Sequence, residues 1–275
     1  MPARAWFQVQ ATGRTARRSI DTRISPAIVA ADMCTVVALI RPSHRYPLLL
    51  AANRDEHRKR PWDPPARHWP DQPDIVAGRD RTAGGTWMGV NRAGVVAAIL
   101  NRAGTLGPAV GKRSRGEIPL LALRHPNAEQ AAAAVGRIDA AEWRDFNLVV
   151  GDRFGAFFIR GLGRGHPTAE RLPDDVAMVT AYDPNDLESP RVARHLPRLR
   201  GDLPDGPDDW AGWRTILSDR SGDVGQQINV SPRGDFATVC SSFVAVPAAG
   251  TPIWLFAAGP PHEAEFRPVD LGFAP

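Results

Sequence analysis

Cys34 carries the sharpest chemistry in the sequence. It directly follows Met33 and opens an apolar, β-branched run, Cys34–Ile40. A cysteine in such a run is most often a buried small hydrophobe. If a chain began at Cys34, one residue would offer both a thiol nucleophile and an α-amine, whose pKa near about 8 suits a general base. Both interpretations, core residue and N-terminal nucleophile, stay open on these residues alone.

Four polar residues follow the next apolar run, Leu48–Ala52. They are Asn53, Arg54, Asp55 and Glu56. The simplest interpretation is a solvated strand end, because four such residues are not expected in a core. Strand alternation puts Arg54 and Glu56 on one face and Asn53 and Asp55 on the other. A guanidinium beside a thiol would lower the thiol pKa, and a carboxylate would hold an α-amine in place.

A glycine-rich segment supplies the third group of candidates. It reads Gly84-Gly85-Thr86-Trp87-Met88-Gly89-Val90-Asn91, and the next apolar strand ends in Asn101. An asparagine amide at a strand end is a common oxyanion donor, although a turn or cap residue is the alternative. Trp62 and Trp87 are candidates to flank a site, and packing is their simpler role.

The elements that must position these residues are mostly short strands. We expect strands at Cys34–Ile40, Leu48–Ala52, Ile75–Ala77, Thr86–Val90, Val95–Leu100, Phe146–Gly151, Gly155–Arg160, Val176–Thr180, Thr238–Val246 and Ile253–Ala257. We expect helices at Glu117–Arg124, Asn127–Gly136, Ser189–Leu199 and Asp208–Leu217, with Ser189 and Asp208 as caps. Residues 57–74 and 104–116 are expected to be loops. Strands, then helices, then strands favour an α+β fold of two antiparallel sheets covered by helices.

Composition and missing motifs exclude several classes. The 275 residues include two cysteines, which is too few for a disulfide scaffold or a multi-cysteine metal site. No apolar run approaches the roughly 20 residues of a membrane span. Most of the net charge of +4 comes from five arginines in residues 1–33, so no nucleic-acid-binding stripe is indicated. The scattered histidines predict no metal site, and there is no phosphate-binding loop or nucleophile elbow.

Residues 1–33 differ in pattern from the rest. A secretory signal, a lipoprotein signal, a propeptide and a wrongly assigned start codon are the alternatives. We expect a disordered extension, either upstream of a true start at Met33 or a propeptide, followed by a single domain over residues 34–275.

Four motifs in this order resemble the NRDE-motif family, also called the transport and Golgi organisation protein 2 family. They are Met33-Cys34, Ala52-Asn53-Arg54-Asp55-Glu56, Gly84-Gly85-Thr86-Trp87-Met88-Gly89 and Ser114-Arg115-Gly116. That family resembles N-terminal nucleophile hydrolases of the bile-salt hydrolase and penicillin V acylase group. The resemblance implies a four-layer αββα sandwich and hydrolysis of a linear amide through a thioester. It matches Cys34, Arg54, Asn91 and Asn101 to that group's pattern, and it places Asp183 where those acylases have an oxyanion asparagine.

The resemblance therefore predicts a cytoplasmic cysteine amidohydrolase for a small linear amide. Cys34 would attack, Arg54 would stabilise the thiolate and Asn101 the oxyanion, with Asp55 as a further catalytic residue. The expected substrate-binding residues are Asn53, Glu56, Trp87 and Asn91. No metal, nucleic acid or integral membrane segment is expected. The alternative is a non-catalytic carrier of haem or lipid on the same fold, since eukaryotic members are associated with haem trafficking; haem would then be the ligand.

Overall fold

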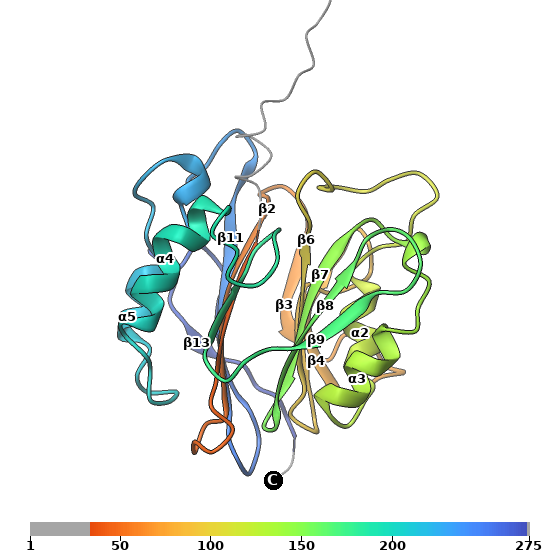
Figure 1. Cartoon of the computed structure of the whole chain (residues 1–275), viewed down its shortest axis with the longest axis horizontal. Helices are drawn as coiled ribbons and strands as arrows, with labels where there is room; N and C mark the ends of the chain where they lie inside the picture. The colour runs from red at the N-terminus through yellow and green to blue at the C-terminus, as the bar shows by residue number, and fades with distance from the viewer. Residues whose placement is uncertain (1–33, 274–275) are drawn as a thin grey trace, which may run out of the picture.

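Two antiparallel β-sheets lie face to face in the middle of the molecule, and helices cover both outer faces (Figure 1). The computed structural model describes residues 34–273, so the expectation for residues 1–33 falls outside the described residues. The resulting order is helix, sheet, sheet, helix. The predicted α+β, four-layer αββα sandwich is thus confirmed.

The first sheet has six strands in the order β10-β1-β2-β11-β12-β13. Their bounds are Thr35–Ile40 (β1), Leu48–His57 (β2), Val176–Val179 (β10), Phe236–Val246 (β11), Ile253–Ala257 (β12) and Arg267–Pro268 (β13). The strand β2 lies between β1 and β11, with Asn53 paired to Thr35 on one side and to Ser241 on the other. The chain therefore puts the start of β1 next to the polar half of β2.

The second sheet has seven strands in sequence order, β3 to β9. Their bounds are Trp62–Ala66 (β3), Ile75–Asp80 (β4), Met88–Asn91 (β5), Val96–Asn101 (β6), Phe146–Asp152 (β7), Gly155–Gly161 (β8) and Thr168–Arg171 (β9). Every connection except that between β6 and β7 joins neighbouring strands without an intervening helix. Strands that follow one another in the chain are therefore neighbours in this sheet, as in an antiparallel meander.

Four α-helices form the outer layers among the described residues. Two follow β6, Glu117–Ala122 (α2) and Ala128–Val135 (α3), and two follow β10, Pro190–Arg200 (α4) and Ala211–Leu217 (α5). Short 3-10 turns occupy Ala140–Glu142 and Val224–Gln226. Ser189 caps α4, because its hydroxyl accepts a hydrogen bond from the Val192 N–H. The prediction for Asp208 is wrong: Trp210 precedes α5 and no side chain caps it.

Strand alternation sorts the core into three layers of apolar side chains. In β1, Val36, Ala38 and Ile40 pack between the sheets. Val37 and Leu39 pack against α4 and α5. A third cluster lies under α2 and α3. Among residues 34–273, no helix combines the length and the apolar character that crossing a bilayer requires.

Candidate functional site

Cys34 lies directly before β1 and opposite Arg54 of β2, because Thr35 pairs with Asn53. The Cys34 Sγ accepts a hydrogen bond from the Asp55 N–H at 3.4 Å. The same sulfur donates to the Asp55 carbonyl at 3.6 Å. The thiol is therefore held against the backbone of the neighbouring strand.

Burial raises the pKa of the Cys34 thiol to about 12. The Asp55 carboxylate acts in the same direction, while the hydrogen bond from the Asp55 backbone and the charge of Arg54 lower the pKa. Arg54 thus acts with the predicted sign, but burial outweighs it. The expected increase in thiolate is absent, and the thiol is protonated at neutral pH. Nucleophilic attack from Cys34 needs a base.

Arg54 is 6% exposed and is contacted on several sides. Its guanidinium carbon lies 4.4 Å from the centre of the Trp87 ring, a cation–π contact. Its Nη2 lies 3.5 Å from a Glu56 oxygen and 3.6 Å from an Asp80 oxygen. Its Nη1 is buried and has no hydrogen-bond partner among the described residues. One donor of a fixed guanidinium is therefore available for a ligand oxygen.

A cavity of about 20 Å³ joins these residues between the two sheets. Its lining includes Cys34, Arg54, Trp87, Met88, Cys240 and Ser242. This volume accommodates about one water molecule. Cys240 is buried, as predicted, and reaches the cavity beside a β-bulge between Thr238 and Cys240. The structure thus brings Cys34, Arg54 and Trp87 together, with Glu56 on the Arg54 side of the strand.

Two charged residues that the sequence analysis missed complete this network. Asp80, at the end of β4 in the other sheet, accepts a 2.6 Å hydrogen bond from Arg60 Nε and pairs with Arg54. Arg60 in turn lies 3.7 Å from Glu56. The pair of Arg54 and Asp80 bridges the two sheets, and Arg54 lines the cavity. The available signal was a charged pair, Arg79-Asp80, at the end of an apolar strand, which is the same pattern that drew attention to Arg54.

Arg115 is a second cation near the thiol. Burial and the neighbouring Arg144 lower its pKa to about 10, whereas the charges of Cys34 and Asp145 raise it. Its Nη1 donates to the carbonyls of Thr105 at 2.9 Å and Asp145 at 3.0 Å. Arg115 therefore holds the loop between β6 and α2 close to the site.

The two glycine-containing motifs touch each other. A Cβ on Gly85 would lie 2.5 Å from the Gly116 carbonyl carbon, and the Thr86 N–H donates to the Gly116 carbonyl at 2.9 Å. Only glycines allow this backbone approach. It keeps Trp87 and Arg115, which follow and precede these glycines, in adjoining segments.

The side chains of Asn53 and Asp55 bind away from the thiol. Asn53 donates to the carbonyls of Leu217 at 3.0 Å and Ile228 at 2.9 Å, in the outer layer. An Asp55 oxygen lies 3.1 Å from Arg191 Nη1, and the other accepts from Thr238. The predicted separation of the polar segment into two faces is therefore present, but these two side chains are already engaged.

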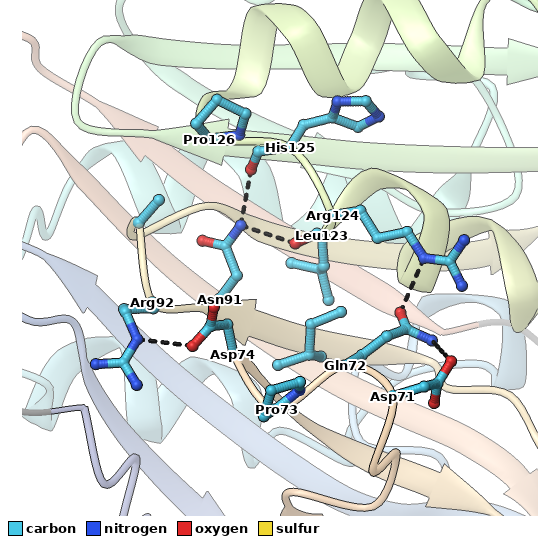
Figure 2. A pocket seen from close by; sticks show the side chains of 12 residues that line it. Asp71, Gln72, Pro73, Asp74, Asn91, Arg92, Leu123, Arg124, His125 and Pro126 are labelled. Atoms are coloured by element: carbon cyan, nitrogen blue, oxygen red, sulfur yellow. Dashed lines mark hydrogen bonds and ion pairs between the residues drawn. The ribbon is translucent and has the colours of Figure 1, made fainter.

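Asn91 lies at the opposite end of β5 from Trp87. Its Nδ2 donates to the carbonyls of Leu123 and His125, both at 2.8 Å, as Figure 2 shows. A surface cavity of about 670 Å³ surrounds it. Two arginines of that cavity, Arg92 and Arg124, point away from each other, and Arg92 pairs with Asp74 at 2.7 Å (Figure 2). The structure does not bring Asn91 to Cys34; it fixes the turn between α2 and α3.

Asn101 ends β6 at the same end of the molecule as Cys34. The Ala103 N–H donates to the Ala181 carbonyl at 3.2 Å, which ties this strand end to the segment after β10, the neighbour of β1. Asn101 is half-buried and is not one of the residues lining the 20 Å³ cavity. The carboxylate of Asp183 is paired with Arg102 at 2.8 Å and with Arg160. The two guanidinium groups neutralise this carboxylate.

Residues 34–273 contain no group of three or more His, Cys, Asp and Glu side chains arranged to hold a metal ion.

Comparison with known proteins identifies relatives in sequence and in fold. A family model described as Transport and Golgi organisation 2 matches residues 33–181. The Transport and Golgi organization protein 2 homolog of Bos taurus is 30% identical over 129 residues, which are 44% of this chain and 45% of that protein. The match therefore spans less than half of the curated relative.

Two solved structures share the fold. One is the Caenorhabditis elegans ortholog of N-acylethanolamine-hydrolyzing acid amidase, with 13% identity, a TM-score of 0.53, and coverage of 78% of this chain and 93% of that chain. The other is a variant of the conjugated bile acid hydrolase of Clostridium perfringens, with 12% identity, a TM-score of 0.51, and coverage of 88% and 94%. Both belong to the N-terminal nucleophile hydrolases, and at these identities the likeness shows the fold alone.

Proposed function

Because this chain belongs to the transport and Golgi organisation 2 family and has the fold of N-terminal nucleophile hydrolases, we propose that it is a cysteine amidohydrolase for a small linear amide. The observation that carries the proposal is the shared cavity of Cys34 and Arg54, where a thiol lies beside a guanidinium with one unpartnered donor.

The proposed nucleophile is a Cys34 whose α-amine is free. A thiol with a pKa of about 12 is a poor nucleophile at neutral pH. An α-amine on the same residue, with an ordinary pKa near about 8, accepts the thiol proton. Activity thus requires removal of Met33 and everything before it, by whatever route.

The reaction follows from these groups. Sγ bonds to the amide carbonyl carbon, its proton passes to the α-amine, and the carbonyl oxygen takes the negative charge. Arg54 Nη1, and Asn101 as predicted, would donate to that oxygen. The C–N bond then breaks, and the α-ammonium gives its proton to the leaving amine. Water hydrolyses the thioester and restores the thiol.

The cavity at Cys34 is too small to enclose either an amide substrate or a haem or lipid ligand. Pockets for ligands of drug size measure roughly 300–1,000 Å³, whereas the cavity at Cys34 measures about 20 Å³. It holds about one water molecule, so the substrate, including the carbonyl oxygen that Asn101 would contact, would bind at its edge. The carrier alternative is tested beside the hydrolase below.

The test uses a chain that begins at Cys34, the full chain, and the Cys34→Ser and Asn101→Ala variants. We expect the chain beginning at Cys34 to release amine from one or more linear amides, Cys34→Ser to bind without turnover, and Asn101→Ala to reduce kcat by about a hundredfold. Saturable haem binding, with no turnover of any amide and no effect of Asn101→Ala, would overturn the proposal in favour of the carrier.

We also propose a cytoplasmic location. Cys34 and Cys240 are both unpaired, and free thiols persist in reducing compartments. Fractionation of the native host with compartment markers tests this.

A further inference from the structure

We propose that Arg191 is a positioning residue for Cys34, which it holds through Thr35 and Asp55. The inference rests on the proposed function only in treating Cys34 as the nucleophile. Arg191 lies in α4, in the outer layer, far along the chain from both partners.

One guanidinium nitrogen reaches both residues that flank the thiol. Arg191 is 2% exposed, and its Nη1 lies 3.0 Å from Thr35 Oγ1 and 3.1 Å from Asp55 Oδ2. Thr35 is covalently next to Cys34. The backbone of Asp55 binds the Cys34 sulfur from the adjacent strand. Fixing Thr35 and Asp55 therefore fixes where the sulfur can lie.

The Asp55 carboxylate is also held from a third strand. Thr238 Oγ1 donates to Asp55 Oδ1 at 2.6 Å, and the Val230 N–H donates to the same hydroxyl at 2.8 Å. The bulge in β11 lets Thr238 face Asp55 while Cys240 faces the cavity. Both carboxylate oxygens are thus engaged by buried partners, and Asp55 cannot move without breaking them.

The pair also sets the charge near the thiol. Among the groups that act electrostatically on Cys34, Asp55 and Glu56 raise its pKa and Arg54 lowers it, and Arg115 and Cys240 are also close. Arg191 neutralises the Asp55 carboxylate. Loss of Arg191 removes a positive charge beside that carboxylate, and loss of Asp55 removes a negative charge near the thiol, so the two changes shift the thiol pKa in opposite directions.

These opposite signs define the experiment, which uses the full chain and alkylation of Cys34 by iodoacetamide at mildly alkaline pH. Below its pKa, a thiol loses tenfold in thiolate for each unit by which that pKa rises. We expect Arg191→Met to slow Cys34 labelling about tenfold and Asp55→Asn to accelerate it by about threefold or more. The double variant Asp55→Asn/Arg191→Met should label within about twofold of the wild type, because both charges leave together.

Two controls separate this from a merely structural role. Arg200→Met removes an exposed cation of the same helix, paired with Asp175 at 2.7 Å, and should leave the labelling rate unchanged. The labelling of Cys240 is the control for unfolding. In a variant that is labelled only when it unfolds, Cys34 and Cys240 react with iodoacetamide at the same rate. The double variant has no unpaired buried charge and keeps the test valid if a single variant does not fold.

Equal Cys34 labelling in all folded variants would overturn the role of Arg191. That result with amide turnover intact would leave the proposed function standing. Opposite shifts without turnover of any amide would support Arg191 as the residue that sets the thiol's position and charge, and would overturn the hydrolase.

Discussion

The guanidinium of Arg54 is enclosed by an aromatic ring and two carboxylates, from Trp87, Glu56 and Asp80. Each contact restricts a different part of the side chain. The remaining Nη1 is buried without a hydrogen-bond partner among the described residues, and Arg54 lines the same cavity as Cys34. A donor fixed before the reaction stabilises developing charge without reorganisation. Arg54 is therefore suited to bind an oxygen at the cavity rather than to swing into place.

Gly78 provides the space that Trp87 occupies. A Cβ at position 78 would lie 2.3 Å from the Trp87 ring. We expect Gly78→Ala to displace that ring from Arg54, to lower the free energy of unfolding by about 1–3 kcal/mol, and to slow amide turnover by about tenfold. Urea unfolding and amide hydrolysis measure the two effects.

Gly136→Ala is the matched control. Gly136 follows α3 with a φ of −63°, and the nearest atom to an added Cβ lies at 3.3 Å. It should keep both stability and turnover. If Gly78→Ala had the same stability and amide turnover as Gly136→Ala, the contact of Trp87 with Arg54 would not contribute to function.

At the scale of elements, the sequence predicted where most strands begin but not how far β2 runs. The expected strand ended at Ala52, whereas β2 continues to His57, and Asn53, Arg54 and Asp55 are all buried. The sequence analysis assigned these polar residues to a solvated strand end, because their partners lie far away in the sequence and the local pattern does not show them. One partner of Asp55, Arg191, is 136 residues away. For the same reason the sequence singled out Cys34, Arg54, Trp87 and the motif that contains Arg115, but not Asp80, Arg60 or Arg191.

Three strands were missed because they carry no apolar alternation. The strand β3 reads Trp-Asp-Pro-Pro-Ala and lies at one edge of its sheet, where proline is tolerated. The strand β9 lies at the other edge, and all four of its residues are exposed. The strand β13 is two residues long. Edge strands bury one side at most, so the hydrophobic pattern does not predict them.

The helix α4 contains a histidine that makes stability depend on pH. His195 is fully buried, and burial lowers its pKa to about 4, from an ordinary 6.5. In the unfolded chain His195 therefore takes up a proton below about pH 6.5. In the folded chain the same residue takes up a proton only near pH 4. We expect the contribution of His195 to the free energy of unfolding to be complete above pH 6.5 and to fall by up to about 3 kcal/mol between pH 6.5 and 4.

Urea unfolding of the wild type and His195→Gln across this range isolates the effect. The glutamine amide retains a donor for the Gln226 carbonyl, which His195 Nε2 approaches at 2.7 Å. The His195→Gln protein should lose less stability in acid than the wild type. His166→Gln, at an exposed position, should follow the wild type. Parallel pH profiles for His195→Gln and wild type would contradict the assignment.

At the scale of the whole molecule, three buried asparagines join segments that are distant in sequence. Asn53, Asn91 and Asn147 each donate through Nδ2 to two backbone carbonyls. Asn53 binds the outer layer around α5, Asn91 binds the turn after α2, and Asn147 binds the segment after β10. A buried asparagine within a strand therefore holds layers together here, a role that residue type alone does not distinguish from substrate binding.

Loss of the Asn53 clamp should destabilise the fold. The Asn53 amide binds the Leu217 and Ile228 carbonyls and the Ser241 hydroxyl at 2.6–3.0 Å, and Asn53→Ala removes all three hydrogen bonds. We expect the free energy of unfolding to fall by about 2–5 kcal/mol, measured in urea. Asn127→Ala, which removes only the cap of α3, should lose about 1 kcal/mol. An Asn53→Ala protein no less stable than Asn127→Ala would show that the clamp does not hold the layers.

The central claim, that Cys34 is a nucleophile activated by its own α-amine, is tested most directly by the rate of Cys34 alkylation at neutral pH in two chains. One begins at Cys34 and the other at Met33, so they differ by one residue that blocks the amine. In the chain that begins at Met33 the Cys34 thiol has a pKa of about 12 and no free α-amine beside it, so it should react very slowly. We predict labelling of the chain beginning at Cys34 to be about a hundredfold faster or more, with both chains equally folded by circular dichroism. Equal, slow labelling of the two chains would contradict the account and leave Cys34 as a structural residue.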